Sequence, residues 1–343
     1  MSQPPRKDPR AFSEQRPFVV HVENSRGMMP VFIVHEDEYA DALARHPDVA
    51  RVVKTTWGWD GDIYEQAMKD ADALISYRFA RDRLRERAPN LKWIQVLGAG
   101  VDYMLPLDWV PDDLVLTTNW GAHVPKAELS ALMAILMVNA RIPTLATEQR
   151  NHRWTRIFTS IPEGKTLLIV GVGHIGGAAA AQAKRLGMKV IGIRMSRAPH
   201  PAVDEMLGPE ALHEALPKAD IVLLNTALTS QTRHLMGKRE FALMKKDSAF
   251  INMSRGGLVD QEALEGTLKS GHLACAMIDV ATPEPHPAES PLWDTPNLLM
   301  TPHVLSDDIK HYIPRTLDIF FENIRRYLKG EPLRNVVDLK REY

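Results

Sequence analysis

Residues 166–176 read Thr-Leu-Leu-Ile-Val-Gly-Val-Gly-His-Ile-Gly, an apolar run that leads directly into the pattern G-x-G-x-x-G. The run predicts a buried strand, and the glycines predict a tight turn into a helix. In a dinucleotide-binding turn, Gly171 permits the turn, Gly173 leaves space for a pyrophosphate, and Gly176 lets the helix pack closely. Because a helix N-terminus attracts phosphate, the stretch predicts a nucleotide site, and a structural turn without a ligand is the alternative.

The residues that follow complete a strand–helix–strand unit. An alanine-rich helix is expected over residues 177–186, and a second strand over residues 189–193. A glycine pattern alone occurs by chance before many helices, but the same pattern between two predicted strands is far more specific. The sequence therefore favours nucleotide binding over a plain turn.

The end of the second predicted strand indicates which dinucleotide is preferred. Enzymes that prefer NAD place Asp or Glu about 20 residues after the glycines, where the carboxylate accepts hydrogen bonds from the ribose 2′-OH. This chain has Arg194, Ser196 and Arg197 there, with no carboxylate before Asp204. Because arginine offers paired donors to a phosphate, the residues favour NADP(H), with NAD(H) as the second choice. The alternative is that these arginines belong to an ordinary solvated loop.

Composition limits the class of protein. A chain of 343 residues with 45% hydrophobic residues is expected to form two domains with sizeable cores. A net charge of −1 argues against a general nucleic-acid or membrane surface. The single cysteine, Cys275, fits a reducing compartment and a small core residue, and the 13 histidines show no metal-ligand spacing. Without a signal peptide or a bilayer-length apolar run, we expect a cytoplasmic protein that binds no metal.

The order of elements predicts one domain inserted into another. Residues 1–17 are polar and rich in proline and are expected to form a loose tail. Residues 18–118 predict the first part of a substrate domain, and residues 119–305 a dinucleotide-binding domain with a long helical arm. Residues 306–343 are expected to return to the substrate domain.

Strands alternate with helices in both predicted domains, which is typical of parallel doubly wound sheets. The fold class expected is therefore α/β, with a Rossmann-type NAD(P)-binding domain inserted into a flavodoxin-like substrate domain. Strands are predicted at residues 18–22, 49–54, 73–77, 91–97, 166–170, 189–193, 221–225, 249–252, 274–279 and 298–300. Helices are predicted at residues 39–45, 64–70, 126–141 with a continuation toward 154, 177–186, 260–270 and 312–329.

Polar residues follow three successive predicted strands of the second domain, where a parallel sheet binds its ligands. They are Arg255, Glu284 and His303. An arginine can hold a carboxylate and polarise a ketone, and a histidine can supply a proton. A carboxylate beside that histidine raises its pKa. Together they indicate carbonyl reduction, although each alone is also compatible with a turn, a solvated carboxylate or a loop histidine.

Four motifs resemble those of the D-isomer-specific 2-hydroxyacid dehydrogenase family, in family order and with family spacing. They are Gly171-Val-Gly-His-Ile-Gly176, Asn252-Met-Ser-Arg-Gly-Gly257 with Val259-Asp260, Asp279 with Glu284-Pro285, and Thr301-Pro-His303. The resemblance runs from about Leu91 to the C-terminus. Within the family, it is closest to the NADPH-using glyoxylate and hydroxypyruvate reductases, through Leu97-Gly-Ala-Gly-Val-Asp102, Ser196-Arg197 and Pro287–Trp293.

This resemblance implies reduction of a small 2-keto acid to the D-2-hydroxy acid, with Arg255, Glu284 and His303 as the catalytic triad. It also implies that Gly98, Ala99 and Gly100 present backbone amides to the substrate carboxylate. Residues 126–154 would be the arm of the family's homodimer. The cofactor-binding residues implied are Gly171, Gly173, His174, Ile175, Gly176, Arg194, Ser196, Arg197, Thr226, Ser254 and Asp279, the last accepting the nicotinamide carboxamide.

A binding protein remains the alternative. Corepressors of the C-terminal-binding-protein type resemble this chain in fold and triad, and they favour NAD(H). An NAD(H)-sensing protein with little turnover would therefore carry the same motifs. The arginines after the second strand oppose that interpretation.

Several residues depart from the family pattern or fit two roles. Ala227 stands where the family usually has proline, and Asp307 and Asp308 stand where small residues are common. The two carboxylates are expected to point outward or to cap the next helix. Four further residues fit either a pocket wall or the protein core, namely Trp57, Trp59, Tyr77 and Arg78.

Overall fold

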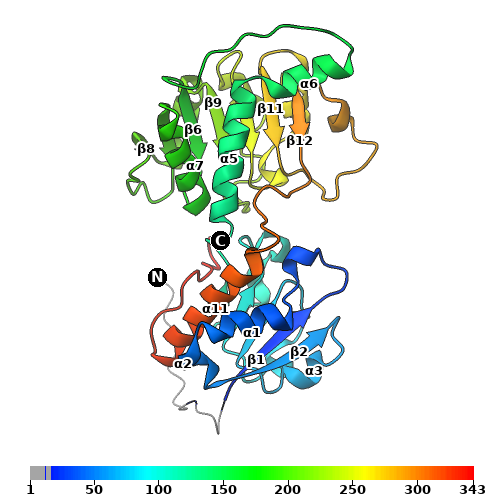
Figure 1. Cartoon of the computed structure of the whole chain (residues 1–343), viewed down its shortest axis with the longest axis vertical. Coiled ribbons are helices and arrows are strands. Elements are labelled where there is room, and N and C mark those ends of the chain that lie inside the picture. Colours follow the sequence, from blue (N-terminus) through cyan, green and yellow to red (C-terminus); the bar gives the residue numbers. More distant parts are fainter. Residues whose placement is uncertain (1–11, 13–16) are drawn as a thin grey trace. The chain divides into compact units, whose positions relative to one another are not determined.

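The computed structural model describes Phe12 and residues 17–343, which form two compact α/β units (Figure 1). The first unit comprises the described residues up to Ala122 together with Asp308–Tyr343, and the second comprises His123–Asp307. The predicted boundaries, after residues 118 and 305, lie within four residues of these. Of the predicted tail, only Phe12 and Pro17 are described, and the rest lies outside the described residues.

The first unit is built on a sheet of five described strands in the order β2-β1-β3-β4-β5. Neighbouring strands pair in parallel. This is the flavodoxin-like order, in which the chain leaves β1 in one direction and β3 in the other. The strands are β1 Phe18–Asn24, β2 Val53–Trp59, β3 Ala73–Ser76, β4 Trp93–Val96 and β5 Val115–Thr117.

One predicted strand of this unit is wrong. Residues 49–54 were expected to be extended, but Pro47–Ala50 form helix α2, and β2 begins only at Val53. Proline is favourable in the first turn of a helix because its missing N–H has no partner there. Val49 is fully buried, and valines at positions 49, 52 and 53 fit a helical spacing as well as a strand.

The C-terminal helix α11, Tyr312–Leu328, returns to the first unit, as predicted, and lies beside α1, Glu36–Ala44 (Figure 1). One face of α11 is apolar and buried in the core of this unit. The buried side chains of that face include Tyr312, Ile313, Leu317, Phe320, Phe321 and Ile324. The other α-helices of the unit are short, α3 at Tyr64–Ala67 and α4 at Leu84–Arg87.

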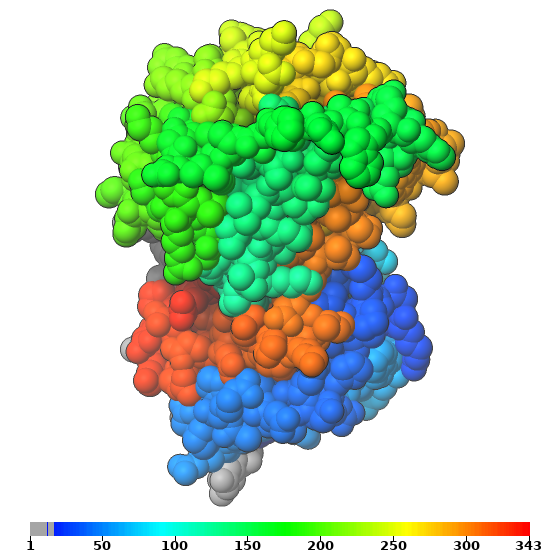
Figure 2. All heavy atoms as spheres, turned by 45° about the horizontal axis from the view of Figure 1, so that its top comes forward, coloured from blue at the N-terminus to red at the C-terminus, as the bar shows by residue number. Residues whose placement is uncertain are grey.

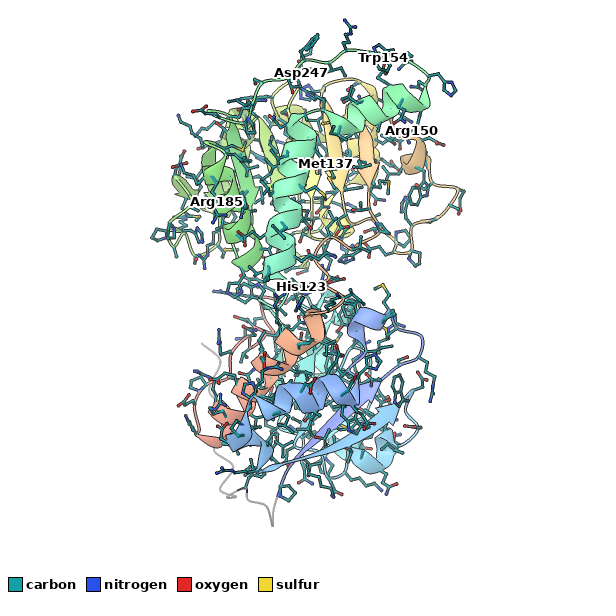
Figure 3. All side chains as sticks on the ribbon, in the orientation of Figure 1. His123, Met137, Arg150, Trp154, Arg185 and Asp247 are labelled. Carbon is teal, nitrogen blue, oxygen red and sulfur yellow. The ribbon has the colours of Figure 1, made fainter. Side chains whose placement is uncertain are left out.

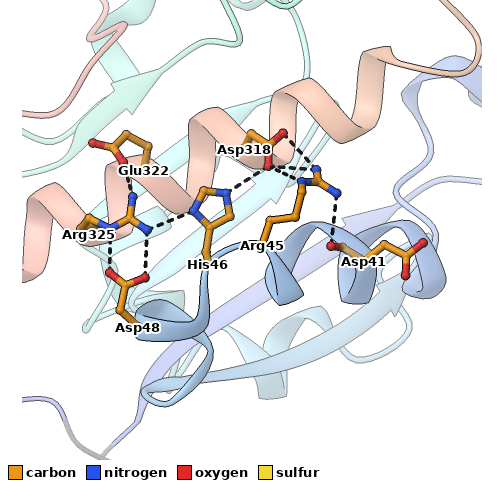
Figure 4. Close-up of polar contacts among 7 residues, drawn as sticks. All are labelled: Asp41, Arg45, His46, Asp48, Asp318, Glu322 and Arg325. Carbon is orange, nitrogen blue, oxygen red and sulfur yellow. Dashed lines mark hydrogen bonds and ion pairs between the residues drawn. The ribbon is translucent and has the colours of Figure 1, made fainter.

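Ion pairs join α1 and α2 to α11 (Figure 4). Arg45 donates to both oxygens of Asp318 at 2.9 and 3.0 Å, and Arg325 donates to both oxygens of Asp48 at 2.6 and 2.9 Å. His46 lies between the two pairs, 3.0 Å from Asp318 and 3.2 Å from Arg325. Because these pairs are solvent-exposed, each is expected to stabilise the fold by at most about 1 kcal/mol. The apolar face of α11 contributes more.

The second unit has a sheet of seven described strands in the order β12-β11-β10-β9-β6-β7-β8, and neighbours pair in parallel. This is the Rossmann order with one further strand, and the chain reverses direction across the sheet between β6 and β9. The strands are β6 Thr166–Val170, β7 Lys189–Ile193, β8 Glu205–Leu207, β9 Ile221–Leu224, β10 Ala249–Asn252, β11 Cys275–Ile278 and β12 Leu298–Met300.

Helix α5, Val124–Asn139, packs on this sheet beside α7, His174–Arg185 (Figure 3). At Arg141 the backbone takes a left-handed conformation, with φ of 58°, and helix α6, Ile142–Arg150, follows. Within the described residues, no single helix is long and apolar enough to cross a membrane; α5 and α6 reach that length only together, with a 62° bend between them. The remaining α-helices are α8 Leu212–Ala215, α9 Lys238–Leu243 and α10 Gln261–Lys269.

Candidate active site

The glycine-rich turn between β6 and α7 has the geometry that its sequence predicted. Gly171 has φ of +104°, and a Cβ atom there would lie 2.3 Å from the carbonyl oxygen of Asn225. A Cβ atom on Gly176 would lie 2.1 Å from the carbonyl oxygen of Gly171. Larger residues are therefore excluded at both positions, and the turn brings the first turn of α7 against the strand end. These residues fit a dinucleotide pyrophosphate.

The helix after this turn begins earlier than predicted. It starts at His174, with Gly173 at its N-cap, and not at residue 177. The earlier start places residues 174–176 in the first helical turn, where backbone N–H groups have no acceptor within the helix. Sequence periodicity missed this start because glycines weaken the helical pattern.

The loop after β7 holds the residues expected to distinguish the two dinucleotides. Arg197, with φ of 51°, forms an ion pair with Glu210, and both side chains are 62% exposed. Asp204 instead accepts a hydrogen bond of 2.8 Å from the N–H of Val190, near the start of β7. It also pairs with Lys184. Asp204 therefore lies near the start of β7, whereas the predicted cofactor site lies beyond the ends of the strands. Glu210 was missed by sequence reasoning, because it is distant in sequence and follows β8.

His303 and Glu284 are in direct contact at the carboxyl edge of the seven-stranded sheet. Nδ1 of His303 lies 2.8 Å from Oε2 of Glu284, and Oε1 of Glu284 accepts a hydrogen bond of 3.1 Å from the N–H of Ala281. Because an ionised carboxylate only accepts, Nδ1 carries the hydrogen in this pair. Nε2 of His303 is then the ring atom left for proton transfer. The side chains are 36% and 39% exposed, so a small molecule can reach them.

The electrostatic surroundings raise the pKa of His303 above its ordinary value. Burial on its own would lower it, and the charge of Arg255 acts in the same direction. The hydrogen bond to Glu284 and the charges of Glu284 and Asp279 more than offset these effects. For the Glu284 carboxyl, burial would raise the pKa, but the hydrogen bond and charge of His303, with smaller effects from Ala281 and Arg255, hold it below its ordinary value.

Asp279 lies beneath the His303 loop and holds it. Its side chain is buried, and Oδ1 accepts hydrogen bonds from the Thr301 hydroxyl at 2.7 Å and the Val304 N–H at 3.0 Å. Oδ2 accepts one from the Leu305 N–H at 3.1 Å, and the Asp279 carbonyl accepts one from the His303 N–H at 2.7 Å. His303 has φ of 55°, an unfavourable region for a non-glycine residue. These four contacts hold it there, a function that sequence reasoning did not assign to Asp279.

The Arg255 loop is fixed from below by Asn252, which is buried at the end of β10. The Asn252 amide donates to the Arg255 carbonyl at 3.0 Å, and its oxygen accepts from the Ser254 N–H at 3.1 Å. The Ser254 hydroxyl donates to the carbonyl of Thr226. A Cβ atom on Gly256 would lie 2.1 Å from the carbonyl group of Ala281, so this loop packs directly on the segment that leads to Glu284.

The loop from Gly98 to Gly100, which was predicted to bind the substrate carboxylate, follows β4 in the first unit. A Cβ atom on Gly98 would lie 3.7 Å from the ring of Tyr77 and 3.8 Å from that of Tyr103. The phenol of Tyr312 donates to the Leu97 carbonyl at 3.0 Å, directly before the loop. The loop is therefore bordered by aromatic rings of its own unit.

Two of the residues that fitted either a pocket wall or the core, Trp57 and Tyr77, pack against the core of the first unit. Trp57 packs edge-to-face on Tyr39 beside the core of the first unit, and Trp59 lies under the guanidinium of Arg26. A Cβ atom on Gly98 would lie at van der Waals distance from the ring of Tyr77, whereas Arg78 is exposed.

The two carboxylates after His303 do not contact it. Asp307 pairs with His123 at 3.2 Å. The side chain of Asp308 accepts hydrogen bonds from the N–H groups of Lys310 and His311, directly before α11. Asp308 therefore stabilises the turn before α11, whereas Asp307 neither points outward nor caps that helix.

A dinucleotide turn, an imidazole–carboxylate pair and an arginine at one sheet edge define an NAD(P)-dependent oxidoreductase. A sequence profile for the NAD binding domain of D-isomer specific 2-hydroxyacid dehydrogenases matches residues 132–304. The chain belongs to this family. Its predicted resemblance and its predicted fold class are confirmed.

Three similar proteins illustrate the range of the family. D-3-phosphoglycerate dehydrogenase of Methanocaldococcus jannaschii is 32% identical over 325 residues, which cover 91% of this chain but only 60% of that protein. Glyoxylate/hydroxypyruvate reductase B of Escherichia fergusonii is 32% identical over 70% of this chain and 76% of its own length. A D-isomer specific 2-hydroxyacid dehydrogenase of Xanthobacter autotrophicus, solved with NADPH and MES, is 32% identical with a TM-score of 0.82, over 94% of this chain and 99% of that one.

Proposed function

We propose that this protein uses NADPH to reduce a small 2-keto acid of the glyoxylate or hydroxypyruvate type to the D-2-hydroxy acid. The observation that carries the proposal is the contact between His303 and Glu284, which raises the pKa of the imidazole and so favours its acid form. When bound, the dinucleotide supplies a hydride to the keto carbon. His303 supplies the proton to the keto oxygen from Nε2, so that one C=O becomes one CH–OH.

Each residue of the site has a defined part in this proposal. The Arg255 guanidinium holds the substrate carboxylate and polarises the ketone, and Glu284 stabilises the imidazolium of His303 before the proton leaves. Asp279 keeps the His303 loop in place, in addition to the carboxamide contact that the resemblance implies. The resemblance implies a carboxylate-binding part also for the backbone N–H groups of the loop from Gly98 to Gly100 in the first unit.

The preference for NADP(H) over NAD(H) is supported by the loop after β7. Arg194, Ser196 and Arg197 are cationic or hydroxyl donors suited to a 2′-phosphate. Asp204, the first carboxylate in sequence, is bound to Val190 and Lys184. The relative solved with NADPH is consistent with this preference. A 2′-phosphate would have to displace Glu210 from Arg197.

Rates with glyoxylate and hydroxypyruvate, each with NADPH and with NADH, test the proposal. An efficient rate with NADPH, well above the rate with NADH, is expected. The second candidate is the NAD(H)-sensing binding protein, favoured by the presence of Glu210 beside Arg197. Tight binding of NADH without measurable turnover of any 2-keto acid would establish that alternative.

We also propose a homodimer formed through the arm of α5, α6 and the segment that follows. Trp154 is 93% exposed and Phe158 is 90% exposed, and Figures 2 and 3 show this stretch on the surface of the second unit. Large apolar side chains exposed together are typical of protein interfaces. Light scattering should give twice the chain mass of 38.6 kDa, and a Trp154→Ala/Phe158→Ala variant should shift toward monomer. The further exposed apolar side chains of the arm are Leu129, Met133, Leu136, Ile142 and Ile161.

A further inference from the structure

A hollow of about 470 Å³ lies within the second unit, at the amino edge of the seven-stranded sheet. Lys165, which directly precedes β6, and Ala274, which directly precedes β11, line it. Arg141, between α5 and α6, lines it from the arm. Because the strands of this sheet are parallel, the hollow lies at the edge opposite the candidate active site, and its lining includes none of the residues assigned to that site.

A smaller hollow of about 120 Å³ adjoins this one and shares part of its lining. Arg141, Lys165 and Asp247, the last labelled in Figure 3, border both hollows. Four cations against two carboxylates leave the combined lining with an excess of two positive charges. A concave surface with such an excess concentrates small anions. The charged residues of the lining are Arg141, Lys165, Lys245, Lys246, Asp220 and Asp247.

The two cations that border both hollows are half-buried and are held by neutral oxygen atoms. Nη2 of Arg141 donates to the Asp247 carbonyl at 2.7 Å, and Nζ of Lys165 donates to the side-chain oxygen of Asn139 at 2.7 Å. Within the part of the chain that the structure describes, neither cation forms an ion pair. Because a guanidinium and an ammonium each carry several N–H donors, most of their hydrogen-bonding capacity remains for another acceptor.

The carboxylates of the lining do not neutralise these two cations. Asp220 accepts hydrogen bonds from the Lys245 ammonium and from the Thr166 N–H, both at 2.8 Å. Asp247 contacts Arg141 through its carbonyl oxygen. Burial lowers the pKa of Lys165 below its ordinary value; the charge of Asp220 opposes this effect, and the charge of Arg141 adds to it. A bound anion would offset both the burial and the repulsion between the cations.

We propose that this hollow binds a small, doubly charged oxyanion of the phosphate class through Arg141 and Lys165. The planar guanidinium can present paired N–H donors to two oxygens, and the ammonium adds a compact charge, a combination suited to a phosphate group. Arg141 belongs to the arm and Lys165 to the start of β6, so the anion connects the arm to the sheet and stabilises the second unit. The inference goes beyond the proposed function, because it requires neither the dinucleotide nor the 2-keto acid.

Calorimetric titration with inorganic phosphate tests the inference, at constant ionic strength set with sodium chloride. Saturating NADP⁺ is present, so that phosphate does not titrate the predicted cofactor loop after β7. The unmodified protein should bind phosphate saturably. Lys165→Met and Arg141→Gln should each weaken that affinity about tenfold or more, because each removes a charge-assisted hydrogen bond. Lys329→Met, the same change at an exposed lysine of the first unit, is the matched control and should keep the affinity.

Thermal unfolding and light scattering distinguish a binding site from a structural role of the two cations. Phosphate should raise the melting temperature of the unmodified protein and of Lys329→Met, and raise that of Lys165→Met much less. Absence of phosphate binding, or equal affinity in all the variants, would overturn the inference, because any bound phosphate would then lie elsewhere. Phe158 of the arm also lines the hollow. If Lys165→Met lost affinity and also changed the mass measured by light scattering, the cations would serve a contact between copies, and the anion site would be contradicted.

Discussion

Nδ1 of His303 lies 2.8 Å from Oε2 of Glu284, and the second oxygen of this carboxylate is held by the N–H of Ala281. The carboxylate therefore cannot rotate freely, and it fixes both the orientation and the tautomer of the imidazole. The same contact raises the pKa of His303 against the opposing effects of burial and of Arg255. One short contact thus sets the geometry and the protonation of the proposed acid.

Replacing His303 with Asn should lower kcat by about 10²–10⁴, the usual contribution of general acid–base catalysis. Asn remains compatible with the left-handed backbone at this position, so the loop should keep its shape. Cofactor affinity, measured by titration of NADPH fluorescence, should change little. Turnover close to that of the unmodified enzyme would mean that another group donates the proton.

The loop after β7 should control the choice of cofactor. Arg194→Ala or Arg197→Ala should weaken the binding of NADPH relative to that of NADH by about 1.5–3 kcal/mol, since each removes a charge-assisted hydrogen bond to the 2′-phosphate. Glu210→Gln should strengthen the binding of NADPH but not that of NADH, because it releases Arg197 from its ion pair. Glu205→Gln, an exposed carboxylate on the neighbouring strand, is the matched control. Equal kcat/KM for both cofactors in the unmodified protein would refute the preference.

Asp279→Asn should act mainly through the His303 loop. An amide oxygen can replace one carboxylate oxygen, but the amide NH₂ would face a backbone or hydroxyl donor. We expect kcat to fall more than tenfold and the free energy of unfolding to fall by about 1–3 kcal/mol. Affinity for NADPH should change less than kcat. If only the affinity for the cofactor fell, Asp279 would act only by binding the nicotinamide carboxamide.

Much of the fold could be predicted because strands and turns leave strong local patterns. Strands β7, β10 and β12 have the predicted bounds, since each is a short apolar run between turns or helices. Strands β5 and β8, each of three residues, were missed, although β12 of the same length was predicted. A strand of that length carries too few side chains to define a period.

The roles of the site residues stay predictions; the contact between Glu284 and His303 was expected from the sequence, whereas the hydrogen bonds that hold the surrounding loops were not. Arg255, Glu284 and His303 follow strands of one sheet, and sequence position alone was enough to select them. The hydrogen bonds from the His303 loop to Asp279, and the pairing of Arg197 with Glu210, join residues 13 to 26 positions apart through loop geometry. Loop conformation depends on tertiary contacts, and no short sequence pattern encodes it.

The most direct test of this account is the pH dependence of kcat/KM for 2-keto acid reduction in Glu284→Gln. In reduction, His303 must start protonated, so the rate falls as pH rises through its pKa. In the unmodified enzyme, Glu284 raises that pKa, so the fall should come above about 6.5. In Glu284→Gln, burial and Arg255 still lower the pKa while the carboxylate charge is gone. The fall should therefore move to lower pH, whereas Glu289→Gln, an exposed carboxylate on the same segment, should leave it in place. A profile that does not move in Glu284→Gln would contradict the account, because Glu284 would then not govern the protonation of His303.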